Sequence, residues 1–314
     1  MNYRELLRKY GIFVVLMILI IFFSVASENF LNANNLLIIA RQVSMLGIAA
    51  VGMCFVLLLG GIDLSIGSQI TLVNIVAAWL MVNGKVSPLL ASLAAIALST
   101  SIGFINGFII AKIKMPPIIV TLSTMTMVEG IAYIICGGQP IFGFPKSFSV
   151  IGQGYIGIIP IPVIVMVIIM SLGAVILNLT YFGRYFYAVG GNEEAANLSG
   201  INVVHVKYLV YTLSGLFAGI AGIVLLSRTN SGQVLSGKGY EFDALTACVL
   251  GGVSVNGGYG KISNVVAGIL ILGVLSNGMV LLNASQYTQM VIKGAVLLFA
   301  VGFDTIQRLR QSKA

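Results

Sequence analysis

The sequence predicts an all-α, polytopic membrane protein with about ten transmembrane helices and with both termini in the cytoplasm. Two properties of its composition point to this fold class. Of the 314 residues, 58% are hydrophobic and only 8% are charged, and the mean hydropathy is +1.04. An ordinary soluble domain carries about 25% charged residues and could not hide so much apolar surface in its core. The composition therefore excludes a soluble enzyme, a disordered chain and a secreted disulfide-rich scaffold.

The distribution of apolar runs predicts the individual helices. A helix needs about 20 mostly apolar residues to cross the hydrocarbon core. The eighth run of the chain is short and rich in glycine, so a broken or re-entrant segment is an alternative there. The first run also fits a cleaved signal peptide, but we favour an uncleaved helix because nine more runs follow. The ten runs, which form one membrane domain over residues 1–314, are approximately 11–27, 43–60, 66–83, 88–111, 117–136, 161–179, 208–226, 242–256, 263–282 and 287–303.

The basic residues predict the orientation of the chain. If the N-terminus is cytoplasmic, eleven of the 17 Lys and Arg residues fall in cytoplasmic segments and five in outer segments, while Lys293 lies within a run. Cytoplasmic loops of membrane proteins carry such an excess, so we expect both termini inside. The net charge of +8 does not indicate nucleic-acid binding, because the basic residues are dispersed between apolar runs. The cytoplasmic set is Arg4, Arg8, Lys9, Lys112, Lys114, Arg184, Lys207, Lys261, Arg308, Arg310 and Lys313.

Two glycine-rich breaks suggest an internal repeat. The octapeptide Gly-Gly-Ile-Asp-Leu-Ser-Ile-Gly at 60–67 is similar to Gly-Gly-Val-Ser-Val-Asn-Gly-Gly at 251–258, an offset of 191 residues. The same offset places the first four runs close to the last four, in the same direction. Internal repeats are common in transporters. The alternative is a chance similarity between two glycine-rich breaks.

No catalytic, metal or cofactor motif is present in the sequence. Residues 257–261 look in part like a phosphate-binding loop, but Ile262 stands where Ser or Thr is required and Val255 where the first Gly should be. We therefore expect no enzymatic activity and no cofactor in this chain. Cysteines occur singly in apolar runs, without metal or redox spacing, at Cys54, Cys136 and Cys248.

The longest cytoplasmic loop, about 180–207, predicts a short surface helix. Asn192 is a suitable N-cap, and Glu193 and Glu194 interact favourably with the positive end of the helix dipole. Gly200 can end the helix in a left-handed conformation. Such a helix either docks in a groove of a partner or simply connects two spans. Its small apolar face is expected to consist of Ala195, Ala196 and Leu198.

Polar residues in the apolar runs are candidates for a gate or a translocation path. Asp63 is flanked by glycines that permit a sharp break, and Ser65 can cap the helix that follows. A charge at mid-membrane costs about 2.5–3.5 kcal/mol on insertion scales. We therefore interpret Glu129 and Lys293 either as an ion pair that holds two helices together or as groups that line the path. Asn74 is one of several uncharged polar residues that suit a neutral polyol or bond between helices.

The segment Glu194-Ala195-Ala196, followed by Gly200, resembles the EAA loop of permease subunits in ATP-binding cassette importers. The ordered set of motifs resembles the ribose-type, sugar branch of these permeases from about residue 30 to 303. One departure from this pattern is Ser254-Val255-Asn256, in place of a Thr-Ser-Leu type of sequence. The further motifs that carry the resemblance are 60–67, 182–185, 200–203, 237–243, 251–252, 257–260 and 289–293.

This resemblance implies a multi-pass permease of the bacterial inner membrane that passes a monosaccharide, with ribose first among them, into the cytoplasm by alternating access. It implies three protein partners besides membrane lipid: a cytoplasmic ATPase subunit, an extracytoplasmic sugar-binding protein and a second permease subunit. Residues 192–196 and Gly200 would couple the chain to the ATPase. Two alternatives are an ion- or proton-coupled secondary transporter, in which Glu129 and Lys293 would be the coupling residues, and a non-transporting scaffold or channel.

Overall fold

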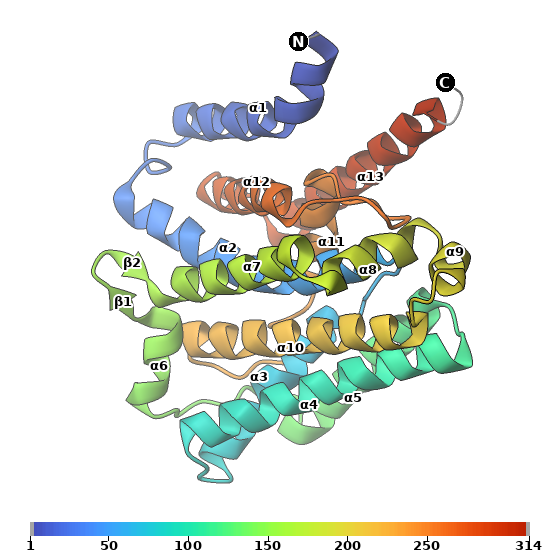
Figure 1. Ribbon diagram of the computed structural model, residues 1–314. Coiled ribbons are helices and arrows are strands. Elements are labelled where there is room, and N and C mark those ends of the chain that lie inside the picture. The colour runs from blue at the N-terminus through green and yellow to red at the C-terminus, as the bar shows by residue number, and fades with distance from the viewer. Residues whose placement is uncertain (1–2, 312–314) are drawn as a thin grey trace.

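The computed structural model describes residues 3–311 and is almost wholly helical (Figure 1). Lys313 lies outside the described residues, as do the side chains of Arg4, Arg8, Lys9, Arg308 and Arg310. The elements are α1 (Tyr3–Ala26), α2 (Ala33–Leu58), α3 (Ile66–Val82), α4 (Pro88–Phe108), a π-helical segment (Ile109–Ile113), α5 (Pro117–Cys136), α6 (Lys146–Gln153), β1 (Tyr155–Ile156), β2 (Ile159–Pro160), α7 (Ile161–Leu179), α8 (Tyr181–Gly191), α9 (Glu193–Leu198), α10 (Val203–Thr229), α11 (Tyr240–Leu250), α12 (Ile262–Leu281) and α13 (Gln286–Gln311).

Local sequence explains where several of these helices begin. Proline occupies one of the first two positions of α4, α5 and α7, where its missing N–H costs nothing and its fixed φ suits a helix. Asn32 caps α2, because its Oδ1 accepts a 3.0 Å hydrogen bond from the Asn34 N–H. The prolines and the capping Asn32, and not the apolar runs, therefore determine where these helices begin.

Each of the ten apolar runs coincides with a helix, but the helices differ in length. Seven helices of the described chain are long and apolar enough to cross a membrane. The apolar part of α1 (Gly11–Ala26) and α3 are shorter. The prediction for 242–256 is wrong in extent, because α11 has 11 residues. At 1.5 Å per residue it is about 16 Å long, roughly half of the hydrocarbon thickness.

The helices form an inner set and an outer set. About 70% of the apolar window is buried in α2, α10 and α12 (67%, 72% and 72%), whereas no residue of the α13 window is buried. Helix α10 packs along α4 and also contacts α2 and α3 (Figure 1). Helix α9 and the end of α13 lie at one end of the molecule, and α6 and the β1–β2 hairpin lie at the other. The outer helices thus present apolar faces to lipid or to another protein.

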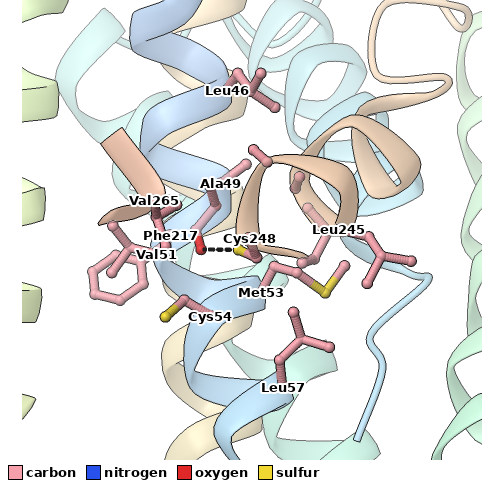
Figure 2. Packing of buried hydrophobic residues seen from close by; sticks show 14 of the residues in the cluster. Leu46, Ala49, Val51, Met53, Cys54, Leu57, Phe217, Leu245, Cys248 and Val265 are labelled. Atoms are coloured by element: carbon pink, nitrogen blue, oxygen red, sulfur yellow. Dashed lines mark hydrogen bonds between the residues drawn. The ribbon is translucent and has the colours of Figure 1, made fainter. Parts of the chain in front are cut away.

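The short helix α11 is inserted into the hydrophobic core against α2. Figure 2 shows Leu245 and Cys248 beside α2, where the Cys248 thiol donates a 3.3 Å hydrogen bond to the Ala50 carbonyl. Cys54 and Cys248 are buried and Cys136 is half-buried, and all three are free thiols. The interpretation of the cysteines as small hydrophobic residues is confirmed for the two that lie in this core.

Each of the two glycine-rich breaks connects two helices, as the predicted repeat requires. Residues 59–65 lie between α2 and α3, and residues 251–261 lie between α11 and α12. The helices before the two breaks differ in length, with 26 residues in α2 and 11 in α11. The repeat therefore stays a prediction.

Close packing of α4 on α10 depends on small residues. A Cβ at Gly103 would overlap the Tyr211 carbonyl oxygen and lie 3.1 Å from Gly215 Cα. Close approach of this kind lets membrane helices gain dispersion energy in lipid, where the hydrophobic effect does not drive helix association.

We expect Gly103→Val to separate α4 from α10 and to destabilise the protein by about 1–3 kcal/mol, the usual cost of overpacking. The matched control is Gly130→Val in α5, because no atom lies within 4 Å of a Cβ at Gly130. Thermal unfolding of the detergent-solubilised proteins measures the difference. Equal midpoints for the two variants would contradict the packing described here.

Candidate functional site

The helix predicted in the cytoplasmic loop is α9, and its capping is as expected. The Oδ1 atom of Asn192 accepts a 2.9 Å hydrogen bond from the Ala195 N–H. Glu193 and Glu194 lie in the first turn, beside the positive end of the helix dipole. Gly200 follows the helix with a φ of +84°, a conformation that glycine adopts without strain.

The predicted apolar face of α9 is wrong. Ala196 is buried against the protein, whereas Ala195 is exposed and Leu198 is 83% exposed. The 3.6-residue period explains the difference, because Ala195 and Leu198 share one side of the helix and Ala196 points elsewhere. Glu194 is exposed as well, four residues before Leu198. The outward surface of α9 therefore includes Glu194, Ala195 and Leu198, with Glu193 and Asn197 also exposed.

An ion pair that the sequence did not reveal ties α9 to α10. The Lys207 ammonium lies 2.7 Å and 2.8 Å from the two carboxylate oxygens of Glu193. The Glu193 side chain is 57% exposed and that of Lys207 is 18% exposed. A pair of this exposure contributes about 0.2–1 kcal/mol, so it orients α9 more than it stabilises the protein.

The backbone at the end of α8 touches both glycine-rich breaks. The Gly258 N–H donates a 2.9 Å hydrogen bond to the Leu58 carbonyl at the end of α2. A Cβ at Gly190 would overlap that same carbonyl and lie 2.6 Å from Gly258 N. A Cβ at Gly257 would lie 2.7 Å from both Gly190 O and Gly60 N. We call these four residues, Gly60, Gly190, Gly257 and Gly258, the glycine junction.

Asp63 lies at the centre of a buried cluster of polar side chains that joins α3, α4, α5 and α10. Its Oδ1 accepts hydrogen bonds from the Ser65 N–H (3.0 Å) and hydroxyl (2.5 Å), and its Oδ2 accepts one from the Ser214 hydroxyl (2.7 Å). No cation pairs with Asp63 in the described part of the chain. The polar cluster consists of Asp63, Ser65, Gln69, Ser99, Asn106, Thr124 and Ser214.

The expected side-chain cap by Ser65 is wrong. Ser65 occupies the N-cap position of α3 but makes no side-chain cap bond. Its hydroxyl instead donates to Asp63 and accepts from the side-chain amides of Gln69 (2.8 Å) and Asn106 (3.1 Å). All its hydrogen-bonding capacity is used within the polar cluster. Asp63 therefore supplies the acceptor at this helix start, because its Oδ1 binds the Ser65 N–H.

Asn74 holds an irregular segment against α3. Residues 230–239, which connect α10 to α11, have no regular structure of their own apart from turns and one bridge from Gly232 to Ile141. The Gln233 N–H donates to Asn74 Oδ1 at 3.0 Å, and the Gly237 N–H donates to Thr71 Oγ1 at 3.1 Å. These side chains satisfy backbone groups that would otherwise be buried without partners.

The predicted ion pair between Glu129 and Lys293 is wrong. Lys293 in α13 pairs with Asp243 in α11, with 2.7 Å between Nζ and Oδ2. Glu129 forms no ion pair with any described residue. Helix packing explains this, because α13 contacts α11 whereas α5 contacts α3. Charge and span assignment identified Lys293 as unusual, but only the tertiary arrangement identifies its partner.

Comparison with known proteins gives consistent matches over nearly the whole chain. The family described as branched-chain amino acid transport system / permease component matches residues 35–301. The ribose import permease protein of Bacillus subtilis is 43% identical over 305 residues, covering 96% of this chain and 94% of that protein. The L-arabinose transport system permease protein of Escherichia coli is 43% identical over 296 residues, with 94% and 90% covered.

A third relative is more distant. The galactose/methyl galactoside import permease protein of Escherichia coli is 36% identical over 328 aligned positions, covering 99% of this chain and 98% of that protein. No solved structure matches the chain significantly.

Removing one of the hydroxyl groups that donate a hydrogen bond to Asp63 should destabilise the protein. Ser214→Ala deletes the 2.7 Å bond to Asp63, and a buried acceptor left without its partner costs about 1–3 kcal/mol. Ser101→Ala is the control, since Ser101 only bonds back to the Ala97 carbonyl. Equal thermal unfolding midpoints for Ser101→Ala and Ser214→Ala would contradict this role of the polar cluster.

Proposed function

Because the chain belongs to the branched-chain amino acid transport system permease component family, we propose that it is the membrane-spanning permease of an ATP-driven sugar importer. It is a multi-pass protein of the bacterial inner membrane. The relatives named for ribose, arabinose and galactose support a monosaccharide as the substrate. Ribose is the sugar that we propose first.

The observation that carries this proposal is the surface of α9. It is a short helix with its outward side chains Glu194, Ala195 and Leu198 free to contact another protein. We propose that this surface docks in a groove of a cytoplasmic ATPase subunit, which hydrolyses ATP on behalf of the permease. An extracytoplasmic binding protein delivers the sugar, and a second copy of the permease completes the complex.

The proposed mechanism is alternating access. ATP binding to the ATPase subunits and docking of the loaded binding protein favour one of two states of the permease, so together they shift the population between outward-open and inward-open forms. Motion of α9 reaches α10 through the Glu193–Lys207 ion pair and reaches α2 and the 251–261 break through the glycine junction. We propose that Asp63 and its polar cluster form the framework of the gate that opens and closes between these states. Glu129 would line the path of the sugar.

We further propose ten crossings with both termini in the cytoplasm. Helices α1–α5, α7 and α10–α13 supply them, and the irregular residues 230–239 begin the crossing that the short helix α11 completes. Irregular backbone is tolerated at membrane depth where protein groups satisfy it. Thr71, Asn74 and Ile141 make such bonds to this segment. The position of α9 and of the end of α13 at one end of the molecule supports the arrangement (Figure 1).

Copurification tests the function. The tagged chain, isolated from its native membrane in mild detergent, should carry a stoichiometric ATPase subunit, and the reconstituted complex should import ribose only with ATP and the binding protein. A chain that imports sugar alone in liposomes would favour the secondary transporter instead.

Substitutions in α9 and just after it should disrupt the contact between the permease and its ATPase. Glu194→Lys reverses the charge on the outward surface, and Gly200→Val forces a β-branched residue into a left-handed conformation, which costs about 1–2 kcal/mol. Sugar uptake and transport-stimulated ATP hydrolysis should fall together by roughly ten-fold, within the usual range of coupling between distant sites.

The control for this pair is Glu28→Lys, which makes the same charge change at an exposed residue between α1 and α2. All variants should reach the membrane in normal amounts, and the separate binding protein should keep its sugar affinity. Normal import by both α9 variants would contradict the coupling role.

Reporter fusions test the topology. A reporter active only in the cytoplasm should give signal at positions 113, 195 and the C-terminus, and none at 147. The physical reason is the excess of Lys and Arg in the segments assigned to the inside. A signal from the outer side at 195 would overturn both the topology and the contact of α9 with a cytoplasmic ATPase.

A further inference from the structure

A small polar chamber lies where α11 meets α2, α12 and α13. Its volume is about 160 Å³, well below the 300–1,000 Å³ of pockets for drug-sized ligands. It therefore suits a solute of the size of one monosaccharide. The polar side chains that line this α11 chamber are Gln42, Lys238, Tyr240, Asp243, Ser276 and Lys293.

Two of the three charged side chains that line the α11 chamber, Lys293 and Asp243, form a pair, and the third, Lys238, is exposed to solvent. Lys293 Nζ and Asp243 Oδ2 are 2.7 Å apart, and their side chains are 29% and 23% exposed. A bound cation would be attracted by Asp243 and repelled by Lys293 at nearly the same distance, and the reverse holds for an anion. The pair therefore favours neither ion. A hydroxyl group both donates and accepts, so it can bond to the carboxylate and to the ammonium at once.

The remaining walls also fit a neutral sugar. Ser276 and Gln42 add an uncharged hydroxyl and an amide, whereas Leu46 and Leu272 form an apolar side. A sugar ring presents hydroxyls at its edge and C–H groups on its faces, so one polar wall and one apolar wall match its two kinds of surface. Binding sites for small molecules commonly combine apolar walls with a few polar groups that fix orientation.

The chamber exists because α11 is short. Its first turn starts at Tyr240, after the irregular residues 230–239, and brings Tyr240 and Asp243 to the chamber wall. Discontinuous membrane helices of this kind place free backbone groups and polar side chains away from the ends of a bundle, where transporters bind their substrates.

We propose that the α11 chamber is a transient binding site for one monosaccharide, in which the hydroxyls of the sugar bond to Asp243 and Lys293. The inference rests on the proposed function and identifies the residues that meet the sugar. The chamber binds weakly and releases the sugar when α11 and α13 change their contact, because a permease must let its substrate leave.

Thiol protection tests this site directly. In the complex of the permease with its ATPase, without binding protein, Ser276→Cys is introduced together with Cys136→Ala, which leaves only the buried native thiols Cys54 and Cys248. A small hydrophilic methanethiosulfonate reagent should modify the new thiol. Ribose at about three times its dissociation constant should slow the reaction roughly four-fold, as simple occupancy requires.

Ser87→Cys, an exposed position outside the chamber, is the matched control and should react at the same rate with and without ribose. A thiol at 276 that never reacts shows that water does not reach the chamber and overturns the proposal. The proposal is also overturned if none of ribose, arabinose and galactose slows the modification of this thiol, even at the highest concentration at which each sugar dissolves.

Uptake by two further variants separates this site from the function of the importer. Asp243→Asn and Lys293→Met should raise the sugar concentration for half-maximal uptake, whereas the matched controls Glu28→Gln and Lys146→Met, both at exposed residues, should leave it unchanged. If the unmodified complex imports sugar with ATP but all four variants behave alike, the chamber is wrong and the function stands. If the unmodified complex does not import sugar, the proposed function itself fails.

Discussion

Direct contact between backbone atoms of three glycine-containing segments is the constraint on which the rest of the structure depends. The end of α8, the break after α2 and the break after α11 meet with no side chain between them. The Leu58 carbonyl, which has no helical partner at the end of α2, is satisfied there by the Gly258 N–H. Gly60, Gly257 and Gly258 all have positive φ, so other residues would be strained as well as too large.

This contact explains why α9 is well placed to act on the membrane domain. Only Asn192 separates α8 from α9, so a displacement of α9 has to pass through only two residues to reach Gly190 in the last turn of α8. Because backbone atoms are in direct contact at the glycine junction, a movement of one segment displaces the others and is not absorbed by side-chain rearrangement. The Glu193–Lys207 pair provides a second and softer connection to α10. We therefore regard the glycine junction as the rigid part of the proposed transmission.

Irregular segments elsewhere in the molecule are stabilised by buried polar side chains. The 59–65 break is held by Asp63 and the polar cluster, and residues 230–239 are held by Thr71 and Asn74 of α3. An unpartnered backbone group in a membrane would cost several kcal/mol. Many of the polar residues in the apolar runs thus serve the architecture. Thr100, Ser101 and Thr126 bond to carbonyls within their own helices and need no role in transport.

Much of this architecture could be predicted from the sequence, because helix formation in membranes follows from local apolar runs. The ten runs coincide with helices, and the cap at Asn192 and the stop at Gly200 were identifiable from residue types. The length of α11 was not, since apolar residues continue from Leu250 into the glycine-rich break and hydropathy does not distinguish helix from loop. The partner of Lys293 could not be predicted from the sequence either, because it depends on which helices pack together.

The most direct test of the glycine junction compares two adjacent substitutions. A Cβ at Gly190 would overlap the Leu58 carbonyl oxygen, whereas no atom lies within 4 Å of a Cβ at Gly191. The measurement is the number of sugar molecules imported per ATP hydrolysed by the reconstituted complex. The account predicts that Gly190→Ala lowers this ratio sharply, while Gly191→Ala, with the same chemical change one residue away, leaves it unchanged. Equal ratios for the two variants would contradict the claim that the junction transmits the motion of α9.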